Sequence, residues 1–212
     1  DHLIEDYNLR IFLTNDGYIK KIPLTSLRSS PEQKLKEGDS IRQECEWHNK
    51  SDILFISSKQ TVYKMKLYEL PDSKAGALGD YLQNILGLEA DEHIVYFIVT
   101  DNYDGEILFA YENGKISRIP LSAYATKTNR KKLINAYSAA APLADVLFIH
   151  GETEIAVSST NDRILVCSSE QIPLKTTKSS QGVQVLKVKK DYKLKYMKRS
   201  EECGFAEIKV YR

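Results

Sequence analysis

A motif that recurs four times along the chain constrains the fold more than any other feature, because a fixed repeat sets the architecture. Residues 11–24 and 107–121 both read as an apolar strand, a polar turn that ends in glycine, a strand of alternating character and Pro-Leu. Residues 53–67 and 155–166 hold weaker copies. Asn or Asp before Gly is typical of a β-hairpin turn, since glycine accepts a positive φ without steric cost. We therefore expect each copy to form a β-hairpin.

The copies divide the chain into four repeats. Aligning Ile19, Val62, Ile116 and Ile164 gives spacings of 43, 54 and 48 residues, and further apolar strands follow each hairpin. Repeats that each hold several strands predict an all-β, propeller-like array of about four blades. Neighbouring repeats bury one another's sheets in such an array, so the whole chain, residues 1–212, is expected to form a single domain. The repeats cover about residues 7–50, 51–102, 103–150 and 151–200.

The formal net charge is only +1, but the charge is unevenly distributed. Residues 1–102 contain 12 Lys and Arg against 17 Asp and Glu, whereas residues 103–212 contain 18 against 12. Clustered cations are typical of a protein with a polyanionic partner, and the alternative is a solvated surface that keeps the protein in solution. The clusters of the second half consist of Arg130, Lys131, Lys132, Lys187, Lys189, Lys190, Lys193, Lys195, Lys198 and Arg199.

Residue types used for metal binding and catalysis are scattered along the chain. Cys45, Cys167 and Cys203 form no C-x-x-C pair, and no histidine has a second ligand three or four residues away. We therefore expect neither a disulfide framework nor a metal site, and the free thiols suit a reducing cytosol. No acid, base and nucleophile converge, so no catalytic residue is expected. The sequence has no apolar run of about 18 residues and no secretory leader, so we expect no membrane association.

Residues 17–24, Gly-Tyr-Ile-Lys-Lys-Ile-Pro-Leu, resemble the repeat motif of the C-terminal domains of DNA gyrase A subunits and topoisomerase IV A subunits. That motif reads as an apolar strand followed by G-x-[IV]-[KR]-[KR]-x-[PL]-[LV]. Residues 61–71 and 82–89 resemble further segments of the family, and residues 179–183 resemble its T-x-x-G-V step in a later blade. The motifs occur in the family's order, and the likeness extends over most of residues 3–190.

The resemblance implies a β-pinwheel, in which each blade exchanges strands with its neighbours. It also implies a non-catalytic domain of a type II DNA topoisomerase that binds double-stranded DNA and bends it around a basic rim to present a segment for strand passage. Strand cleavage and ATP hydrolysis would belong to domains outside this chain. The partners in the full protein would be ATPase B-type subunits and a second A-type subunit. No cofactor is expected in this domain, and its location would be cytoplasmic.

Two departures from the family pattern refine these expectations. Gyrases place a Q-R-R-G-G-x-G box after the first Pro-Leu, and residues 27–38 contain no such box, which favours a topoisomerase IV-like protein. The family commonly has more than four repeats. Either the domain is short, or residues 191–212 form an irregular ending.

A smooth DNA bend needs phosphate contacts spread along an arc rather than contacts that read the bases. Bending 20–30 base pairs by 40–90° costs on the order of 1–6 kcal/mol, which several charge-neutralising contacts can offset. We expect these contacts in the second strand of each hairpin and in the loop after it. Reversing the charge of residues 130–132 should then abolish much of the binding without unfolding the domain. The candidate residues are Lys20, Lys21, Arg28, Lys64, Lys66, Lys74, Lys115, Arg118, Lys127, Arg130, Lys131, Lys132, Arg163, Lys175 and Lys178.

Two other classes of function compete with DNA binding. A propeller-like protein-interaction module without a nucleic-acid role is the main alternative, and the basic second half argues against it. An enzyme with its site in a central channel would need a convergent set of reactive groups, which the sequence lacks.

Overall fold

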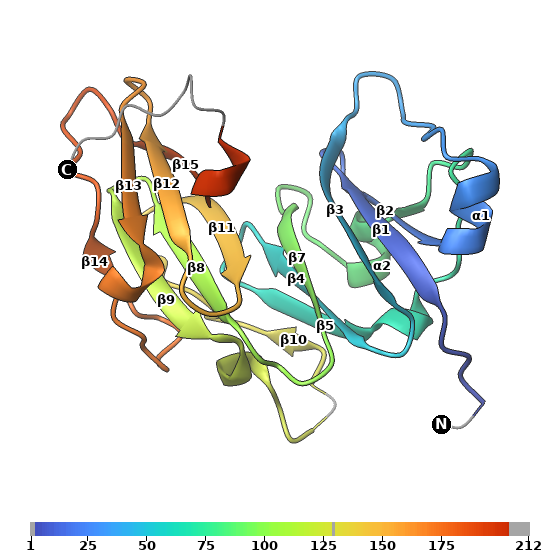
Figure 1. Ribbon diagram of the computed structural model, residues 1–212. Helices are drawn as coiled ribbons and strands as arrows, with labels where there is room; N and C mark the ends of the chain where they lie inside the picture. Colours follow the sequence, from blue (N-terminus) through green and yellow to red (C-terminus); the bar gives the residue numbers. More distant parts are fainter. Residues whose placement is uncertain (1–2, 129, 204–212) are drawn as a thin grey trace. The chain divides into compact units, whose positions relative to one another are not determined.

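The computed structural model describes residues 3–128 and 130–203, and nearly all of its regular structure consists of short strands (Figure 1). Contacts divide the chain into two compact units. The first unit contains the described residues up to Asp101 together with Arg130–Lys132. Its elements are β1 (Asn8–Thr14), β2 (Tyr18–Pro23), α1 (Leu24–Ser29), β3 (Ile41–His48), β4 (Asp52–Ser57), β5 (Val62–Lys66), the 3-10 helix η1 (Leu67–Glu69), β6 (Asp80–Tyr81), α2 (Leu82–Leu86) and β7 (Ile94–Thr100).

The second unit contains the remaining described residues, and the short strand β10 (Lys132–Leu133) begins at the last residue of the first unit. The prediction that residues 1–212 form a single domain stays a prediction. The elements of the second unit are β8 (Glu106–Tyr111), β9 (Lys115–Pro120), η2 (Leu121–Tyr124), β11 (Leu143–Ile149), β12 (Glu154–Ser159), β13 (Ile164–Ser168), η3 (Ser169–Gln171), β14 (Val183–Gln184), β15 (Leu194–Arg199) and η4 (Ser200–Glu202).

The strands form four small antiparallel sheets. Sheet A has the strand order β3-β1-β2-β6, and sheet B has the order β10-β5-β4-β7. Sheet C has the order β11-β8-β9-β14, and sheet D has the order β13-β12-β15. The predicted all-β class is therefore confirmed, with one sheet for each of the four repeats.

All four predicted hairpins are present, as β1–β2, β4–β5, β8–β9 and β12–β13. The residues that end their turns are Gly17, Gln60, Gly114 and Asp162, which occupy the same position in the repeat. All four have a positive φ, between 52° and 94°. The two weak copies of the motif thus adopt the left-handed backbone of the glycine copies, although a side chain makes that conformation less favourable.

Sheets A, B and C are each completed by a strand from the following repeat. The second repeat supplies β6, which pairs with β2, and the fourth repeat supplies β14, which pairs with β9. The third repeat supplies β10, which lies beside β5. Among the described residues sheet D has no such fourth strand, so β13 is an edge strand. The strand exchange implied by the family resemblance is therefore present.

Glycines allow two of these exchanged segments to approach the central strand. A Cβ atom at Gly79 would lie 2.5 Å from the carbonyl oxygen of Ile19, and one at Gly182 would lie 2.3 Å from the backbone of Ile116. Both glycines also have a positive φ, 93° and 79°. No side chain fits between the two backbones at these points, so glycine is required just before β6 and β14.

Each unit has its own hydrophobic core between its two sheets. In the first unit Ile11 of sheet A packs in one cluster with Phe55 of sheet B, and both are fully buried. In the second unit Leu108 of sheet C and Val157 of sheet D are equally buried in a second cluster. Full burial of such a side chain contributes about 1.5–3 kcal/mol. These two cores account for the inward-facing apolar residues of β1, β4, β8 and β12.

Sheet A is covered on its other face as well. Phe12 and Ile22 form a small cluster there with Ala75 of the loop before β6. Leu27 of α1 and Ile41 of β3 pack against this cluster. The central strand β2 is therefore buried on both faces, whereas strands of antiparallel sheets commonly have one face in solvent.

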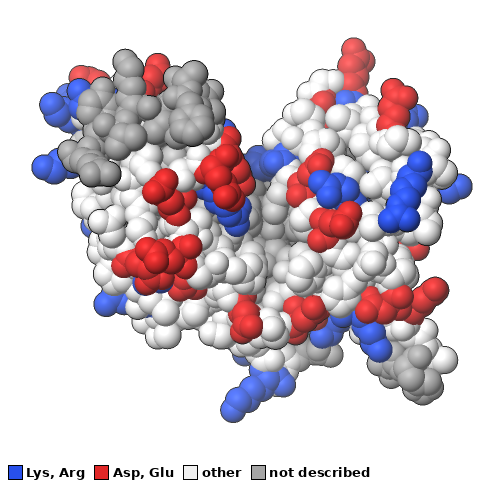
Figure 2. Space-filling view, viewed as in Figure 1, with Lys and Arg blue, Asp and Glu red and all other residues white. Residues whose placement is uncertain are grey.

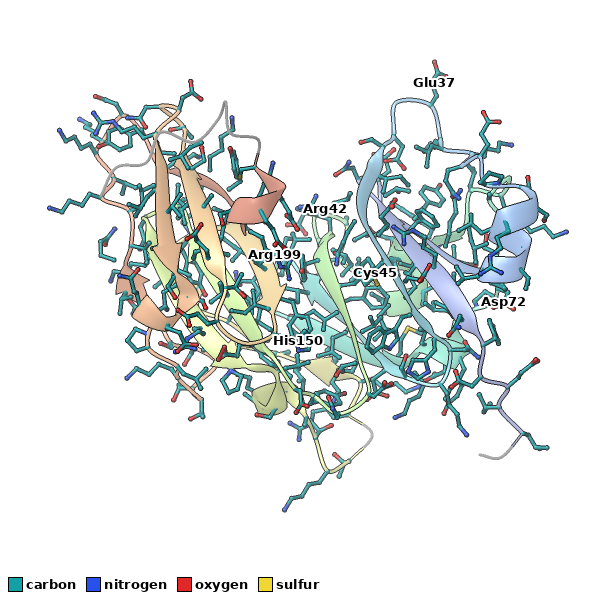
Figure 3. The ribbon with its side chains drawn as sticks, in the orientation of Figure 1. Glu37, Arg42, Cys45, Asp72, His150 and Arg199 are labelled. Atoms are coloured by element: carbon teal, nitrogen blue, oxygen red, sulfur yellow. The ribbon has the colours of Figure 1, made fainter. Side chains whose placement is uncertain are left out.

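A side-chain amide joins the two sheets of the first unit. Gln43 of β3 donates from Nε2 to the carbonyl oxygen of Phe97 on β7 (2.7 Å) and accepts from the Phe97 N–H (2.9 Å). Arg42, labelled in Figure 3, donates from Nε to the carbonyl oxygen of Val95 on the same strand (2.9 Å). These bonds satisfy backbone groups on β7, an edge strand that would otherwise be open to another chain.

The second unit uses the same arrangement between β11 and β15. Arg199, also labelled in Figure 3, donates to the carbonyl oxygen of Phe148. Asp145 accepts a hydrogen bond from the backbone N–H of Met197 (2.9 Å). In both units, therefore, polar side chains rather than further ladder bonds close the edges of neighbouring sheets.

Candidate nucleic-acid interface

Lys20 lies on the covered outer face of sheet A, in register with Phe12. Its side chain is fully buried, and Nζ donates to Gln33 Oε1 (3.0 Å) and to the carbonyl oxygens of Lys34 (2.7 Å) and Ala75 (3.1 Å). Burial lowers the pKa of this amine. All three donors of the ammonium group are used inside the protein, so Lys20 holds two loops together and has no donor left for phosphate.

Lys21 points to the opposite face of β2 and is buried too. Its Nζ donates to Asn49 Oδ1 (2.7 Å) and to the carbonyl oxygen of Leu67 (3.3 Å), and it lies 3.4 Å from the carboxylate of Asp72. Burial lowers the pKa of Lys21, and the negative charge of Asp72 partly opposes this effect. Asp72, labelled in Figure 3, belongs to the segment that leads into β6.

Arg118 of β9 occupies the repeat position of Lys21 and is only 7% exposed. Its Nε donates to the carbonyl oxygen of Ile172 (2.7 Å), and Nη1 lies 3.0 Å from Glu106 and 3.4 Å from Glu170. Ile172 and Glu170 belong to the fourth repeat, which supplies β14 to this sheet. Arg118 therefore anchors the incoming chain, as Lys21 does in sheet A.

These three residues correct the prediction of DNA contacts. Lys20, Lys21 and Arg118 were predicted to contact phosphate, but the structure buries all three side chains and gives them partners within the protein. The second strand is not an edge, since the exchanged strand and its leading segment cover it on the outer side. The backbone shows this directly, because the Ser73 N–H donates to the carbonyl of Lys21 (2.7 Å) and the Lys175 N–H donates to that of Arg118 (2.9 Å).

The exposed cations lie instead on the segments that carry the chain from one sheet to the next. We call these the crossing segments: residues 71–79, 125–131 and 173–182, of which residue 129 lies outside the described part. Each follows a 3-10 helix and leads into an exchanged strand. Hydroxyl side chains flank the cations in all three. Their exposed cations are Lys74, Lys127, Arg130, Lys131 and Lys175.

The first crossing segment borders a surface depression with α1. The depression has a volume of about 720 Å3 and is lined by Ser26 and Ser29 of the helix, by Ser30 just after it, and by Ser73 and Lys74 of the segment. Hydroxyl groups and backbone amides of this kind are common donors to DNA phosphates. Arg28, the basic residue in the last turn of α1, is exposed on the same helix.

Lys131 and Lys132 are exposed, but both also make contacts within the protein. Lys131 Nζ lies 3.4 Å from Glu69, and its carbonyl oxygen accepts from the Lys64 N–H (2.8 Å). Lys132 Nζ lies 5.7 Å from the centre of the Tyr63 ring. A carboxylate at position 131 would face Glu69. The expectation that charge reversal of residues 130–132 leaves the fold intact stays a prediction.

A buried carboxylate interacts with Lys132. Glu92 is 5% exposed and accepts hydrogen bonds from Ser57 Oγ (2.5 Å), Tyr63 Oη (2.9 Å) and the Glu89 N–H (3.1 Å). Burial alone raises the pKa of Glu92, but these bonds and the charge of Lys132 outweigh it, so the pKa lies below its ordinary value. A second carboxylate at position 132 would repel this buried anion.

The remaining candidates differ in accessibility. Arg163 is exposed, and Lys66 is exposed but lies 2.7 Å from Asp52. Lys64 and Lys115 are half-buried, and Lys178 is half-buried with Nζ 5.6 Å from the centre of the Tyr124 ring. Whether these cations contact DNA stays a prediction.

Charged side chains are distributed differently over the surfaces of the two units (Figure 2). In Figure 2, acidic side chains gather in the middle of the visible face of the second unit, and lysines and arginines protrude mostly along its margin. Over the first unit the two signs are mixed in this view. Arg10 and Glu44 form an ion pair in this unit. Cations at a margin suit an extended anion that runs along an edge better than a ligand held in a pocket.

Other chemistry has little support in the described part of the chain. No three His, Cys, Asp or Glu side chains among residues 3–128 and 130–203 are placed to hold a metal ion. No helix in that part is long and apolar enough to span a membrane. His48 lies between two carboxylates, with Nε2 2.9 Å from Asp101 and Nδ1 3.0 Å from Asp6. Its hydrogen bond to Asp101, with that to Asp6, raises the pKa of His48 above its ordinary value.

A small all-β unit repeated with exchanged strands defines a propeller-like class of domains. The family model described as "DNA gyrase C-terminal domain, beta-propeller" matches residues 11–31, 51–101 and 153–201, which is more than half of the chain. The chain belongs to this family.

Individual relatives agree with this assignment. The A subunit of DNA gyrase from Mycoplasma genitalium is 26% identical over 191 residues, which cover 86% of this chain and 23% of the relative. The chain therefore spans less than a quarter of the length of this relative. A crystal structure of the C-terminal domain of DNA topoisomerase IV matches 93% of this chain and 62% of its own with a TM-score of 0.78 and 22% identity. The Escherichia coli ParC C-terminal domain matches 90% of this chain and 79% of its own with a TM-score of 0.66 and 16% identity.

These structural likenesses confirm the predicted propeller-like fold. The identities of both solved structures are too low to support more than the fold. The choice between a topoisomerase IV-like and a gyrase-like protein stays a prediction, since both names occur among the proteins that this chain is similar to.

Proposed function

We propose that this chain is a non-catalytic domain that binds duplex DNA and bends it through sequence-independent contacts to phosphate. The observation that carries the proposal is the recurrence of exposed cations on equivalent crossing segments, beside hydroxyl groups that can donate to phosphate. Recurrence matters because a repeated structure presents equivalent charges at regular steps along a surface. A bend needs such a series of contacts and needs no base readout.

The role in the parent protein follows from the family. We propose that the parent is an ATP-dependent type II topoisomerase whose catalytic domains lie outside this chain. There the domain would present a DNA segment for strand passage, beside ATPase B-type subunits and a second A-type subunit. It would need no cofactor of its own and would act in the cytoplasm.

The corrected set of contacts changes the expected strength of binding. We expect no phosphate contact from Lys20, Lys21 and Arg118, because they are buried, and Lys66 and Lys131 must first separate from Asp52 and Glu69. Exposed pairs of this kind contribute only about 0–1 kcal/mol, so phosphate can displace the carboxylate. We expect sequence-tolerant binding that weakens steeply with salt, since each phosphate contact contributes about 0.9 to the slope of log K against log salt.

A titration with a random-sequence duplex tests the proposal. Fluorescence anisotropy between about 50 and about 200 mM salt gives the slope. A variant with Lys74, Lys127 and Lys175 changed to Gln should lose about 2.7 from that slope, or about 0.9 per contact. The matched control changes Lys34, Lys36 and Lys50, which are exposed lysines outside the crossing segments, and should lose much less.

Two outcomes would count against the proposal. Absence of duplex binding at the lowest salt would exclude the DNA role and favour the protein-interaction module. Equal slopes for the two variants would mean that the crossing segments are not the interface. Energy transfer between dyes at the two ends of the duplex measures the bend, and it should rise when wild-type protein is added.

A further inference from the structure

The turn between β14 and β15 carries a second group of cations, which lies outside the contacts predicted from the hairpin motif. We call residues 185–193 the lysine turn. A bridge between Lys189 and Tyr192 closes its tip, where the Tyr192 N–H donates to the Lys189 carbonyl (3.1 Å). Lys187, Lys189 and Lys190 are all exposed. The turn therefore presents three ammonium groups within four residues of a closed loop.

The backbone of the lysine turn is fixed on both sides. At its start the N–H groups of Val185 and Leu186 donate to the carbonyl of Gly114 (3.0 and 3.1 Å). At its end the carbonyl of Lys193 accepts from the N–H of Thr160 (2.9 Å). Leu186 is buried in the core of the second unit. Because these bonds fix the backbone, a ligand does not need to order the loop before the ammonium groups can act.

The other repeats provide an internal comparison. The segments in the same place, between the exchanged strand and the next long strand, are residues 82–93 and 134–142. Neither contains a Lys or Arg, and residues 82–93 contain three acidic residues instead. The connection is thus made twice without any cation. The lysines of residues 185–193 are therefore not required by the fold.

Little negative charge offsets these lysines. Lys193 lies 2.7 Å from Glu112 and is neutralised by it. For Lys187, Lys189 and Lys190, no carboxylate lies within ion-pair distance among residues 3–128 and 130–203. Adjacent like charges repel each other, so the folded unit keeps a local excess of positive charge at some cost in stability. A bound polyanion would remove that repulsion.

We propose that the lysine turn is a phosphate-binding site that contacts the backbone of the duplex bound by the crossing segments. This proposal rests on the proposed function, since it assigns the turn to the same ligand. Lys187, Lys189 and Lys190 would each approach a phosphate without reading a base, because an ammonium on a flexible stem acts as a point charge.

The test compares two triple variants of the full 212-residue chain. One changes Lys187, Lys189 and Lys190 to Gln, and the control is the Lys34, Lys36 and Lys50 variant, which removes the same charge. The turn variant should lose about 2–3 from the salt slope, at about 0.9 per contact, and the control should lose less than about 1. The control should melt at the wild-type temperature, and the turn variant at that temperature or slightly above it because charge repulsion is relieved, which excludes misfolding as the cause.

A second measurement needs no mutation. Brief acetylation of the lysines, read by mass spectrometry with and without duplex, reports which amines the DNA covers. We expect protection of Lys187, Lys189 and Lys190 and none of Lys34 and Lys36. Unprotected turn lysines together with protected Lys74 and Lys175 would overturn this proposal and leave the proposed function standing. Absence of any DNA binding would overturn both proposals. Equal losses of salt slope in the two triple variants would overturn this one, because removal of charge elsewhere would then have the same effect.

Discussion

Replacing Arg118 with methionine tests whether this cation stabilises the fold or contacts DNA. Methionine keeps an unbranched apolar stem but removes the guanidinium from Glu106 (3.0 Å) and from the carbonyl of Ile172 (2.7 Å). The side chain of Glu106 is only 15% exposed, so its charge would be left largely buried without a partner. Removing one partner of a buried pair costs about 3–5 kcal/mol. Glu170 is half exposed and can be solvated instead, so we expect the lower end, about 3 kcal/mol.

Thermal and urea unfolding measure this loss. For a chain of this size each kcal/mol corresponds to about 2–4 °C, so the melting temperature should fall by about 6–12 °C. Adding Glu106→Gln to the variant removes the unpaired charge and should restore about 1–2 kcal/mol. The DNA affinity of the folded variant should stay at the wild-type value. The matched variant Lys175→Gln should show the reverse, a normal melting temperature and weaker binding.

The refuting result is equally definite. If Arg118→Met melts like the wild type while its salt slope falls by about 0.9, the guanidinium reaches a phosphate and the structural assignment is wrong. If Glu106→Gln adds to the loss instead of reducing it, the buried pair is not the source of the stability.

Three further changes test other parts of the structure. Gln43→Ala leaves the N–H and carbonyl of Phe97 unpaired and should cost about 1–3 kcal/mol in urea unfolding; an unchanged midpoint would mean that water replaces the amide. Because hydrogen bonding to Asp101, with a second carboxylate, raises the pKa of His48, its stabilisation is complete below the unfolded pKa of about 6.5 and is lost as pH rises through the folded pKa. His48→Gln should therefore lower the melting temperature more at about pH 5.5 than at about pH 9, and an equal loss at both would contradict this. Gly182→Ala introduces a side chain against the backbone of β9 and should cost about 1–3 kcal/mol, with faster hydrogen exchange in β14; unchanged exchange would show that the strand accommodates it.

The hairpins could be predicted because each depends on a pattern within a short stretch of sequence. The hairpins follow from an apolar strand, a strand of alternating character and the position of the turn residue between them, and even Gln60 and Asp162 adopt a positive φ. The exchanged strands are only two residues long, so they have no periodicity to recognise. Their signal was Gly79 and Gly182, each just before such a strand, where the backbone approaches its neighbour too closely for a side chain.

The candidate site was predicted less well, for a physical reason. Lys20 and Lys21 were predicted to contact phosphate because they lie in the second strand of a hairpin, but both are buried. Sheet A is covered on both faces, and that covering comes from residues far along the chain, such as Asp72 and Ala75. Nothing local to the pair reveals it. The loop cations, Lys74 and Lys175 among them, are exposed, because loops seldom become buried.

Because β6, β10 and β14 are exchanged, the sequence repeat and the structural blade have different boundaries. A duplication that copies one stretch of about 48 residues copies most of one blade and the closing strand of the previous one. Deleting the second repeat would take β6 away from sheet A as well as removing sheet B. Gain or loss of a blade can therefore be neutral only when the breakpoints keep each hairpin followed by a compatible closing strand. The permitted breakpoints are set by the crossing segments, not by the motif that makes the repeat visible.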